Sequence, residues 1–116
     1  MQQSYRLRKN RDFQRVYRRG KSVGSHLMAL AWSRAPGGSL KIGFSVSKKI
    51  GNAVTRNRVR RRMREAVRMR IPYLHHGYYL IFIARHAVAE ADFHAIDASV
   101  DKLLRRAGLY KRDDSC

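Results

Sequence analysis

The sequence predicts an α+β fold, an α-β sandwich in which helices pack against a small, mostly antiparallel sheet. Its 116 residues are enough for one domain and too few for two. Apolar residues alternate with polar ones over residues 40–47, as in a strand with one buried face, and after residue 55 they recur at helical spacing. We therefore expect one domain over residues 1–116 in the order α-β-β-α-β-α, with an extra short strand near residues 22–25.

The first element is expected to be a short helix that Asn10 caps and Gly20 ends. Phe13, Val16 and Tyr17 share one of its faces. Phe13 and Tyr17 are either core residues or a platform on which unpaired bases stack, since stacking tolerates any base. The platform is favoured by the polar tip of Tyr17 and by the surrounding cations, which are Arg11, Arg15, Arg18 and Arg19.

Two strands are expected next, over residues 27–32 and 40–46. The first is a continuous apolar run, and the second alternates between apolar and polar residues. A short turn rich in Pro and Gly separates them, so we expect the two strands to form an antiparallel hairpin. Met28 and Trp32 belong either to the core, which is the better-supported alternative, or to the same surface as Phe13 and Tyr17.

The next helix is expected over residues 55–71, and Pro72 ends it. Its apolar side chains fall on one side and can dock on the sheet, while the rest of its surface is almost wholly cationic. The apolar stripe consists of Val59, Met63, Ala66, Val67 and Ile71.

The arginines of this segment indicate a partner that carries phosphate groups. Eight arginines lie between Ser45 and Arg70, against a single glutamate. Arginines three or four positions apart repel one another on a helix, and no local carboxylates compensate. Phosphates suit them because each guanidinium offers a planar fork of donors that stays charged. Asn57 either contacts a phosphate or caps the helix.

The last two elements are a strand over residues 78–84 and a helix over residues 89–107. The strand is continuously apolar, which is typical of a strand covered on both faces. The helix packs through apolar residues at helical spacing and ends at Gly108. Residues 109–116 are expected to form a frayed tail.

Charge is concentrated in the first part of the chain. Residues 1–70 carry 20 basic residues (Lys and Arg) against two acidic ones, whereas residues 71–116 carry six basic and six acidic residues. This asymmetry points to a polyanion, with nucleic acid as the leading candidate. No apolar run approaches the roughly 20 residues of a membrane span, and the start lacks the apolar core of a signal peptide. With Cys116 as its single cysteine, the protein is expected in the cytoplasm, without a membrane partner.

The sequence offers no convincing protein-borne catalytic or metal site. The basic half has no paired carboxylates for acid–base catalysis, and the five histidines lack metal-ligand spacing. Any RNA chemistry in which the protein takes part therefore needs a reacting centre supplied by another molecule.

One run of the sequence is specific enough to suggest a family, namely Ile50-Gly-Asn-Ala-Val-Thr-Arg-Asn-Arg-Val-Arg-Arg-Arg-Met-Arg64. Through this run, which fits the basic signature of the family, the chain closely resembles the protein subunit of bacterial ribonuclease P. The preceding residues 43–49 and the first helix, residues 11–20, also fit, and the likeness extends to residue 111. The family fold includes a β-α-β crossover that carries the basic helix.

The resemblance implies a ribonucleoprotein endonuclease whose catalyst is a large RNA. This hydrolase removes the 5′ leader from precursor tRNA, and its Mg²⁺ ions belong to the RNA and the substrate phosphates rather than to a protein site. The protein, monomeric by itself, binds the catalytic RNA and holds the single-stranded leader in a cleft between the first helix and the sheet.

Carried over residue by residue, the family's motifs give two sets of site residues and no catalytic one. The expected RNA-binding set is Arg56, Asn57, Arg58, Arg60, Arg61, Arg64, Lys48 and Lys49. The expected leader-binding residues are Phe13 and Tyr17, with Met28 added as a partial replacement for an aromatic residue that the family often places near Ala31. Arg62 stands where the family commonly has an aliphatic residue.

A non-catalytic RNA-binding module, such as a ribosomal protein or an RNA chaperone, is the alternative. Charge does not separate the two functions, because both need a basic helix on a small α+β fold. The family-specific run over residues 43–64 favours the ribonuclease P subunit.

Overall fold

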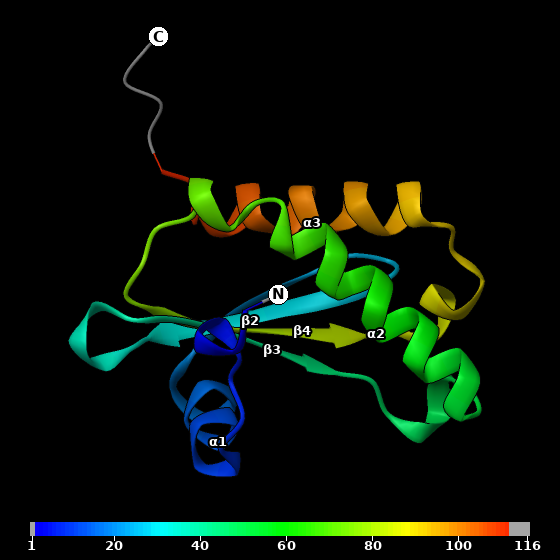
Figure 1. Ribbon diagram of the computed structural model, residues 1–116, viewed down its shortest axis with the longest axis horizontal. Coiled ribbons are helices and arrows are strands. Elements are labelled where there is room, and N and C mark those ends of the chain that lie inside the picture. The colour runs from blue at the N-terminus through cyan, green and yellow to red at the C-terminus, as the bar shows by residue number, and fades with distance from the viewer. Residues whose placement is uncertain (1, 112–116) are drawn as a thin grey trace, which may run out of the picture.

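Three α-helices and a four-stranded sheet make up the fold, which a computed structural model describes for residues 2–111. Helix α1 (Asn10–Arg19) lies against one face of the sheet. Helices α2 (Ala53–Arg68) and α3 (Phe93–Ala107) lie on the other face, so the sheet is placed between two helical layers (Figure 1). The predicted α+β sandwich is confirmed.

The strand that is apolar on both faces lies inside the sheet. Strand β4 (Tyr78–Ala84) pairs antiparallel with β2 (Met28–Arg34) and parallel with β3 (Leu40–Ser45). The short strand β1 (Lys21–Gly24) pairs antiparallel with β2 and completes the order β1-β2-β4-β3. Because β3 and β4 are parallel neighbours joined through α2, the basic helix lies on a β-α-β crossover.

The predicted hairpin between the strands at 27–32 and 40–46 is wrong. β4 lies between these strands and pairs with both, so that Leu80 is opposite Trp32 on one side and Ile42 on the other. The Pro- and Gly-rich connection after β2 is held at the start of β4 instead, where Ala35 N donates to Gly77 O at 2.8 Å. The hairpin that does form joins β1 to β2.

Alternation along the strands divides the apolar side chains between two cores. The larger core lies between the sheet and helices α2 and α3, and it contains every residue of the predicted stripe on the basic helix. The smaller core lies under α1 and consists of Leu7, Val16, Ala31, Tyr79 and Ile81, with Phe13 packed against it. The second face of the sheet is therefore covered by a much smaller apolar contact than the first.

Helix α1 ends where the chain comes close to its neighbours. Lys9 occupies the N-cap position and Asn10 is the first helical residue, so the predicted Asn10 cap is wrong. Gly20 does end the helix, in an extended conformation. A Cβ at Gly20 would lie 2.5 Å from the carbonyl oxygens of both Val16 and Trp32, so this position has no room for a side chain.

Helix α2 begins two residues earlier than predicted because Asn52 caps it. Its side-chain Oδ1 accepts a hydrogen bond from Thr55 N at 2.9 Å. The helix ends at Arg68, and the chain continues in a 3₁₀ turn over Ile71–Tyr73 that buries Ile71. The apolar stripe thus extends beyond the end of the α-helix itself.

Helix α3 is shorter than predicted at its start. Residues His86–Glu90 form a 3₁₀ turn, and Asp92 then caps α3 by accepting from Ala95 N at 2.8 Å. Gly108 ends the helix with φ 70°, a left-handed conformation that glycine adopts without a Cβ penalty.

The predicted frayed tail is wrong for residues 109–111, and residues 112–116 lie outside the described part. Leu109 is buried, and its carbonyl accepts from His75 N at 2.8 Å. Lys111 N donates to Tyr73 O at 2.8 Å, so these residues are fixed beside the loop that follows α2. Among residues 2–111, no helix combines the length and the apolar character needed to cross a membrane.

Candidate nucleic-acid interface

The apolar stripe of α2 determines which way its arginines point. Val59, Met63, Ala66 and Val67 are buried against the sheet and α3. The side chains between them therefore lie on the outer surfaces of the helix, and these are mostly arginines. The cationic surface is part of a docked, fixed helix rather than of a mobile segment.

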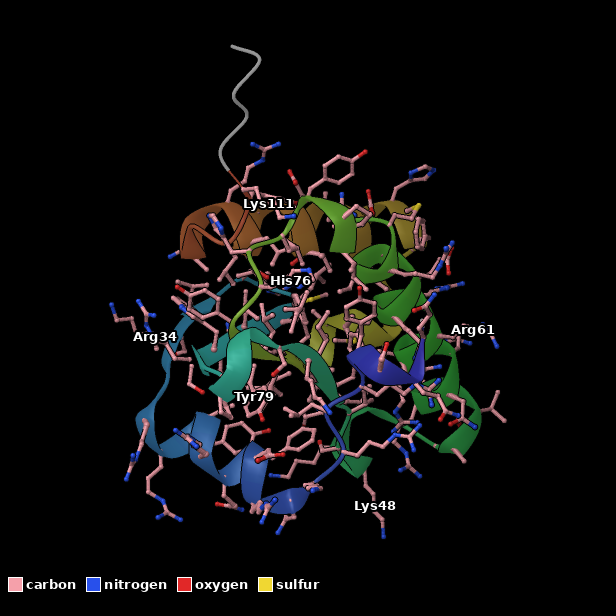
Figure 2. All side chains as sticks on the ribbon, turned by 60° about the vertical axis from the view of Figure 1, so that its left-hand side comes forward. Arg34, Lys48, Arg61, His76, Tyr79 and Lys111 are labelled. Carbon is pink, nitrogen blue, oxygen red and sulfur yellow. The ribbon has the colours of Figure 1, made fainter. Side chains whose placement is uncertain are left out.

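The predicted RNA-binding arginines differ in what they contact within the protein. Arg61 is exposed and extends away from the body of the molecule (Figure 2). Arg60 is partly exposed, and its Nη1 donates to Asn57 Oδ1 at 3.1 Å. Arg56 and Arg64 are half-buried, and the Nε of each is enclosed without a hydrogen-bond partner.

Arg58 and Arg62 are turned towards the segment before α3. Arg58 Nη2 donates to Ala89 O at 3.2 Å, and Arg62 Nη1 donates to Ala91 O at 3.0 Å. Both arginines therefore hold this segment against α2, which is a structural role that the sequence did not suggest. Each guanidinium retains further N–H donors for an external acceptor.

Asn57 does not cap the helix, since Asn52 does. It is exposed in the second turn, and its side-chain oxygen accepts from Arg60. Of its two predicted roles, only contact with a phosphate remains open.

Lys48 and Lys49 lie just before α2, in the 3₁₀ turn Lys48–Ile50 that leads out of β3. Both lysines are exposed, and Figure 2 shows Lys48 extending outward. They add positive charge near the N-terminal end of α2, where the helix dipole also favours an anion.

Carboxylates are scarce around these cations. Glu65, the one acid of α2, is paired with Arg68, and this hydrogen bond lowers the pKa of its carboxyl. Burial, followed by the charges of Arg6 and Arg60, lowers the pKa of Arg64. Within residues 2–111, the ion pairs do not include any arginine between positions 56 and 64. The positive potential of α2 is thus largely uncompensated.

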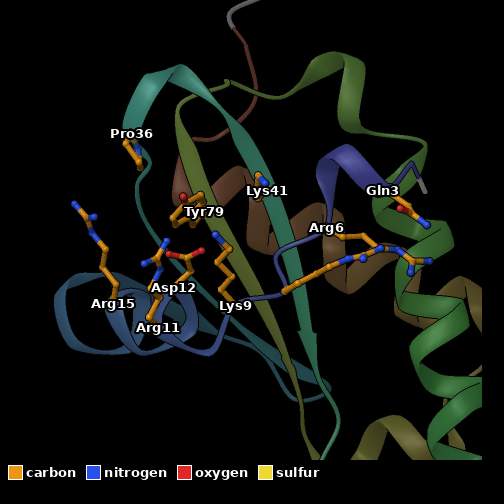
Figure 3. A pocket seen from close by; sticks show the side chains of 10 residues that line it. Gln3, Arg6, Lys9, Arg11, Asp12, Arg15, Pro36, Lys41 and Tyr79 are labelled. Carbon is orange, nitrogen blue, oxygen red and sulfur yellow. The ribbon is translucent and has the colours of Figure 1, made fainter.

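A second cationic surface is a groove between α1, the N-terminal segment and the sheet (Figure 3). It encloses about 590 Å³, with Tyr79 and Lys41 contributed by the sheet. Its lining carries six Lys and Arg side chains against one acid. These residues are Arg6, Arg8, Lys9, Arg11, Arg15 and Lys41, with Asp12 as the acid.

The two aromatic residues of α1 have different environments. Phe13 is half-buried and lies over Gly43, where an added Cβ would be 2.5 Å from the ring. Tyr17 is 47% exposed, and its ring centroid is 6.4 Å from that of Phe13. Phe13 therefore fixes α1 to the sheet, and the Tyr17 ring is left accessible to solvent.

The prediction that Met28 lines a leader-binding cleft between α1 and the sheet is wrong. Met28 is fully buried, and it belongs to the core on the opposite face of the sheet. Trp32 is half-buried, packs against that same core and also borders a hollow with Arg15 and Arg19. Ala31 does lie on the face that α1 covers, but it is buried there.

Sequence reasoning missed Arg6, Lys9, Lys41 and Tyr79. The alternation of residues 40–47 contained a signal for Lys41, because it puts this lysine on the face opposite the larger core. Arg6 and Lys9 precede the first predicted element, so no periodicity placed them. Their position depends on a β-bridge between Arg6 and Ile42.

The arrangement is suited to binding phosphates and stacking bases. Guanidinium and ammonium groups supply charge-assisted donors, and Tyr17 supplies an exposed aromatic face. In the described part of the chain, no three or more His, Cys, Asp or Glu residues come together as they would to hold a metal ion.

The chain is similar in sequence to a known protein family. The family model described as Ribonuclease P matches residues 1–108. The ribonuclease P protein component of Caldanaerobacter subterraneus subsp. tengcongensis is 40% identical and covers 94% of both chains. That of Symbiobacterium thermophilum is 39% identical over 97% of this chain and 99% of the relative.

Solved structures are similar over nearly the whole length as well. An RNase P protein from Staphylococcus aureus has a TM-score of 0.87 and 32% identity, covering 94% of this chain and 100% of the other. One from Thermotoga maritima has a TM-score of 0.79 and 27% identity, covering 87% and 96%.

Proposed function

Because this chain belongs to the ribonuclease P family, we propose that its two cationic surfaces bind two different RNA molecules. As a ribonuclease P protein component, it functions in tRNA processing within an endoribonuclease complex. Its α2 surface binds the catalytic RNA, and its groove beside α1 binds the 5′ leader of precursor tRNA. Binding the leader promotes its endonucleolytic removal.

The observation that carries this proposal is the uncompensated charge of α2. Its arginines from position 56 to 64 are held on a docked helix, and their described contacts are to neutral oxygens rather than to carboxylates. An RNA backbone supplies a regular series of phosphates that matches such a surface. If these arginines served only to stabilise the fold, more of them would be expected to pair with Asp or Glu.

The surface of α1 suits a single strand rather than a duplex. Tyr17, which lies outside the lining of the groove, offers one exposed ring, on which a base can stack only if it is unpaired. The lysines and arginines that line the groove can bind the backbone phosphates of such a strand. The 5′ leader of a precursor tRNA is a single strand of this kind.

The reaction itself is proposed to take place in the catalytic RNA. Mg²⁺ would be bound there and by the substrate phosphates, where it would assist hydrolysis. The cationic protein surfaces are a poor environment for another cation, since their charge raises the energy of a nearby metal ion. The part of the protein is to bind and to orient.

A cytoplasmic location and a protein that is monomeric in isolation complete the proposal. The alternative function, a ribosomal or chaperone-like RNA-binding module, is disfavoured by the family match over residues 1–108.

Mixing the purified protein with a ribonuclease P RNA and a precursor tRNA tests the proposal. The protein by itself is expected to leave the precursor intact. With the RNA at low Mg²⁺, it is expected to increase the rate of leader removal, because its cations replace metal ions in neutralising phosphate repulsion. Cleavage that is unchanged by adding the protein would contradict the proposed function.

A further inference from the structure

We propose that Arg6, together with Arg60 and Arg64, forms a binding site for one phosphodiester group at the junction between the groove and α2. The site rests on the proposed function and adds a residue from outside the basic helix. It also connects the two cationic surfaces, which the proposed function treats as separate.

Arg6 is positioned by its backbone rather than by chance exposure. It follows the 3₁₀ turn Gln3–Tyr5 and forms a parallel bridge with Ile42, with Leu7 N donating to Ile42 O at 2.9 Å. Tyr5, just before it, packs against the larger core. From this anchored backbone the Arg6 side chain extends past the edge of β3 towards α2 (Figure 3).

Arg64 is close enough to both Arg6 and Arg60 to be affected by their charges. Arg6 and Arg60 are the two charges that, after burial, lower the pKa of Arg64. The Nε atoms of both Arg6 and Arg64 are enclosed without a hydrogen-bond partner. None of the three takes part in an ion pair within residues 2–111. A partly buried cluster of like charges with unpaired donors is unfavourable unless an anion joins it.

A phosphodiester group has the chemistry to complete this cluster. Its two non-bridging oxygens accept from guanidinium forks in a planar, two-point geometry, and its charge offsets the mutual repulsion of the arginines. Arg6 also lines the groove, so the bound phosphate lies where the two surfaces meet. Either the catalytic RNA on α2 or the leader in the groove can supply this phosphate.

Replacement of Arg6 tests the site. Arg6→Gln is expected to weaken RNA binding by about tenfold, the equivalent of one charge-assisted contact. It is also expected to reduce the slope of log affinity against log salt by about 0.7–0.9. Lys102→Gln is the matched control, because it removes one charge from an exposed position on α3 and should change neither quantity. An Arg6→Gln protein that behaves like this control would overturn the proposal.

A double-mutant cycle distinguishes a shared phosphate from separate contacts. If Arg6 and Arg64 hold the same group, the affinity of Arg6→Gln/Arg64→Gln is well above that expected from multiplying the two single losses. Fully multiplicative losses would contradict a shared site. Arg6→Lys keeps the charge without the fork, and it is expected to restore most of the salt slope but only part of the affinity.

Two ligands identify the source of the phosphate. If Arg6→Gln weakens only the binding of the catalytic RNA, the phosphate belongs to that RNA. If it weakens the binding of precursor tRNA but not of mature tRNA, the phosphate belongs to the leader. Arg60→Ala is measured alongside. If Arg60→Ala weakens binding and Arg6→Gln does not, the junction site fails while the proposed function stands; if neither does, the proposed function fails as well.

Discussion

Arginine has three distinct roles in this chain, and the neighbours of each residue decide which one it has. Arg61 extends into solvent and is free to meet a ligand. Arg58 donates to the carbonyl of Ala89 and helps to hold the fold. Arg70 forms a half-buried ion pair with Asp97, so its charge is compensated within the protein. A count of positive charges therefore overstates the number of residues available to RNA.

The network around Arg70 holds Tyr110 against α3. Tyr110 donates to Asp101 Oδ1 at 2.6 Å and accepts from Arg70 Nε at 3.0 Å. Burial, reinforced by the hydrogen bond to Asp101, raises the pKa of Tyr110 to about 12. Burial alone would raise the pKa of Asp101, but the hydrogen bonds from Tyr110 and Arg105 outweigh it and lower the pKa. The neutral phenol is thus the form that the fold stabilises.

Tyr110→Phe is expected to lower the free energy of unfolding by about 1–2 kcal/mol at neutral pH, because it removes these hydrogen bonds. In the parent protein, the contribution of Tyr110 is present below its unfolded-state pKa of 10.0 and is lost as the pH rises towards about 12. The difference between the two proteins should therefore shrink over that interval. Urea denaturation at several pH values measures it, and a difference independent of pH would contradict this account.

Single residues could be predicted from sequence when their environment is local. Tyr17 lies on a helix whose periodicity and neighbouring arginines suggested an exposed aromatic, and it is exposed. Core packing was the better-supported alternative for Met28 and is confirmed, whereas its assignment to the cleft is wrong. The face on which a strand residue lies depends on which strands pair and which helices cover them. The alternation of Met28 with Ala29 puts it in the larger core.

At the scale of elements, the position of α1 depends on the close contact between Phe13 and Gly43. The ring occupies the space where a side chain on this part of β3 would lie. Val16 adds the buried part of the contact, and Tyr17 remains outside it. The groove keeps its shape only while this contact holds α1 on the sheet.

Gly43→Ala is expected to displace Phe13 and to destabilise the protein by about 1–3 kcal/mol through overpacking. Precursor binding should weaken with it, because α1 forms one wall of the groove, whereas binding through α2 should change little. Ser45→Ala, two residues along the same face of β3, serves as the control. Unchanged stability and unchanged precursor binding in Gly43→Ala would show that α1 is not positioned in this way.

The elements themselves could be predicted more fully than their pairing. The apolar run at residues 78–84 agrees with β4 residue for residue, because a central strand carries its signal within itself. The prediction of a hairpin between β2 and β3 was wrong because β4, which comes much later in the chain, pairs with both strands. β4 offers an apolar strand with two open edges, and β2 and β3 each take one.

At the scale of the whole molecule, the acid-poor first 70 residues supply α1, β3 and α2, which carry both cationic surfaces. The later residues have balanced charge and supply β4 and α3, against which the elements with the cationic surfaces pack. This division explains why a net charge of +18 is compatible with a packed fold. The charge is directed outward by elements whose inner faces are apolar.

Leader recognition is what the protein is proposed to add to the catalytic RNA, and one comparison of affinities tests this role. Complexes of a ribonuclease P RNA with the parent protein or with Tyr17→Ala are titrated with precursor tRNA and with mature tRNA. We predict that Tyr17→Ala weakens precursor binding by roughly 1–3 kcal/mol, the worth of one stacked base, and leaves mature tRNA binding nearly unchanged. Equal losses for both tRNAs, or no loss for either, would contradict this role.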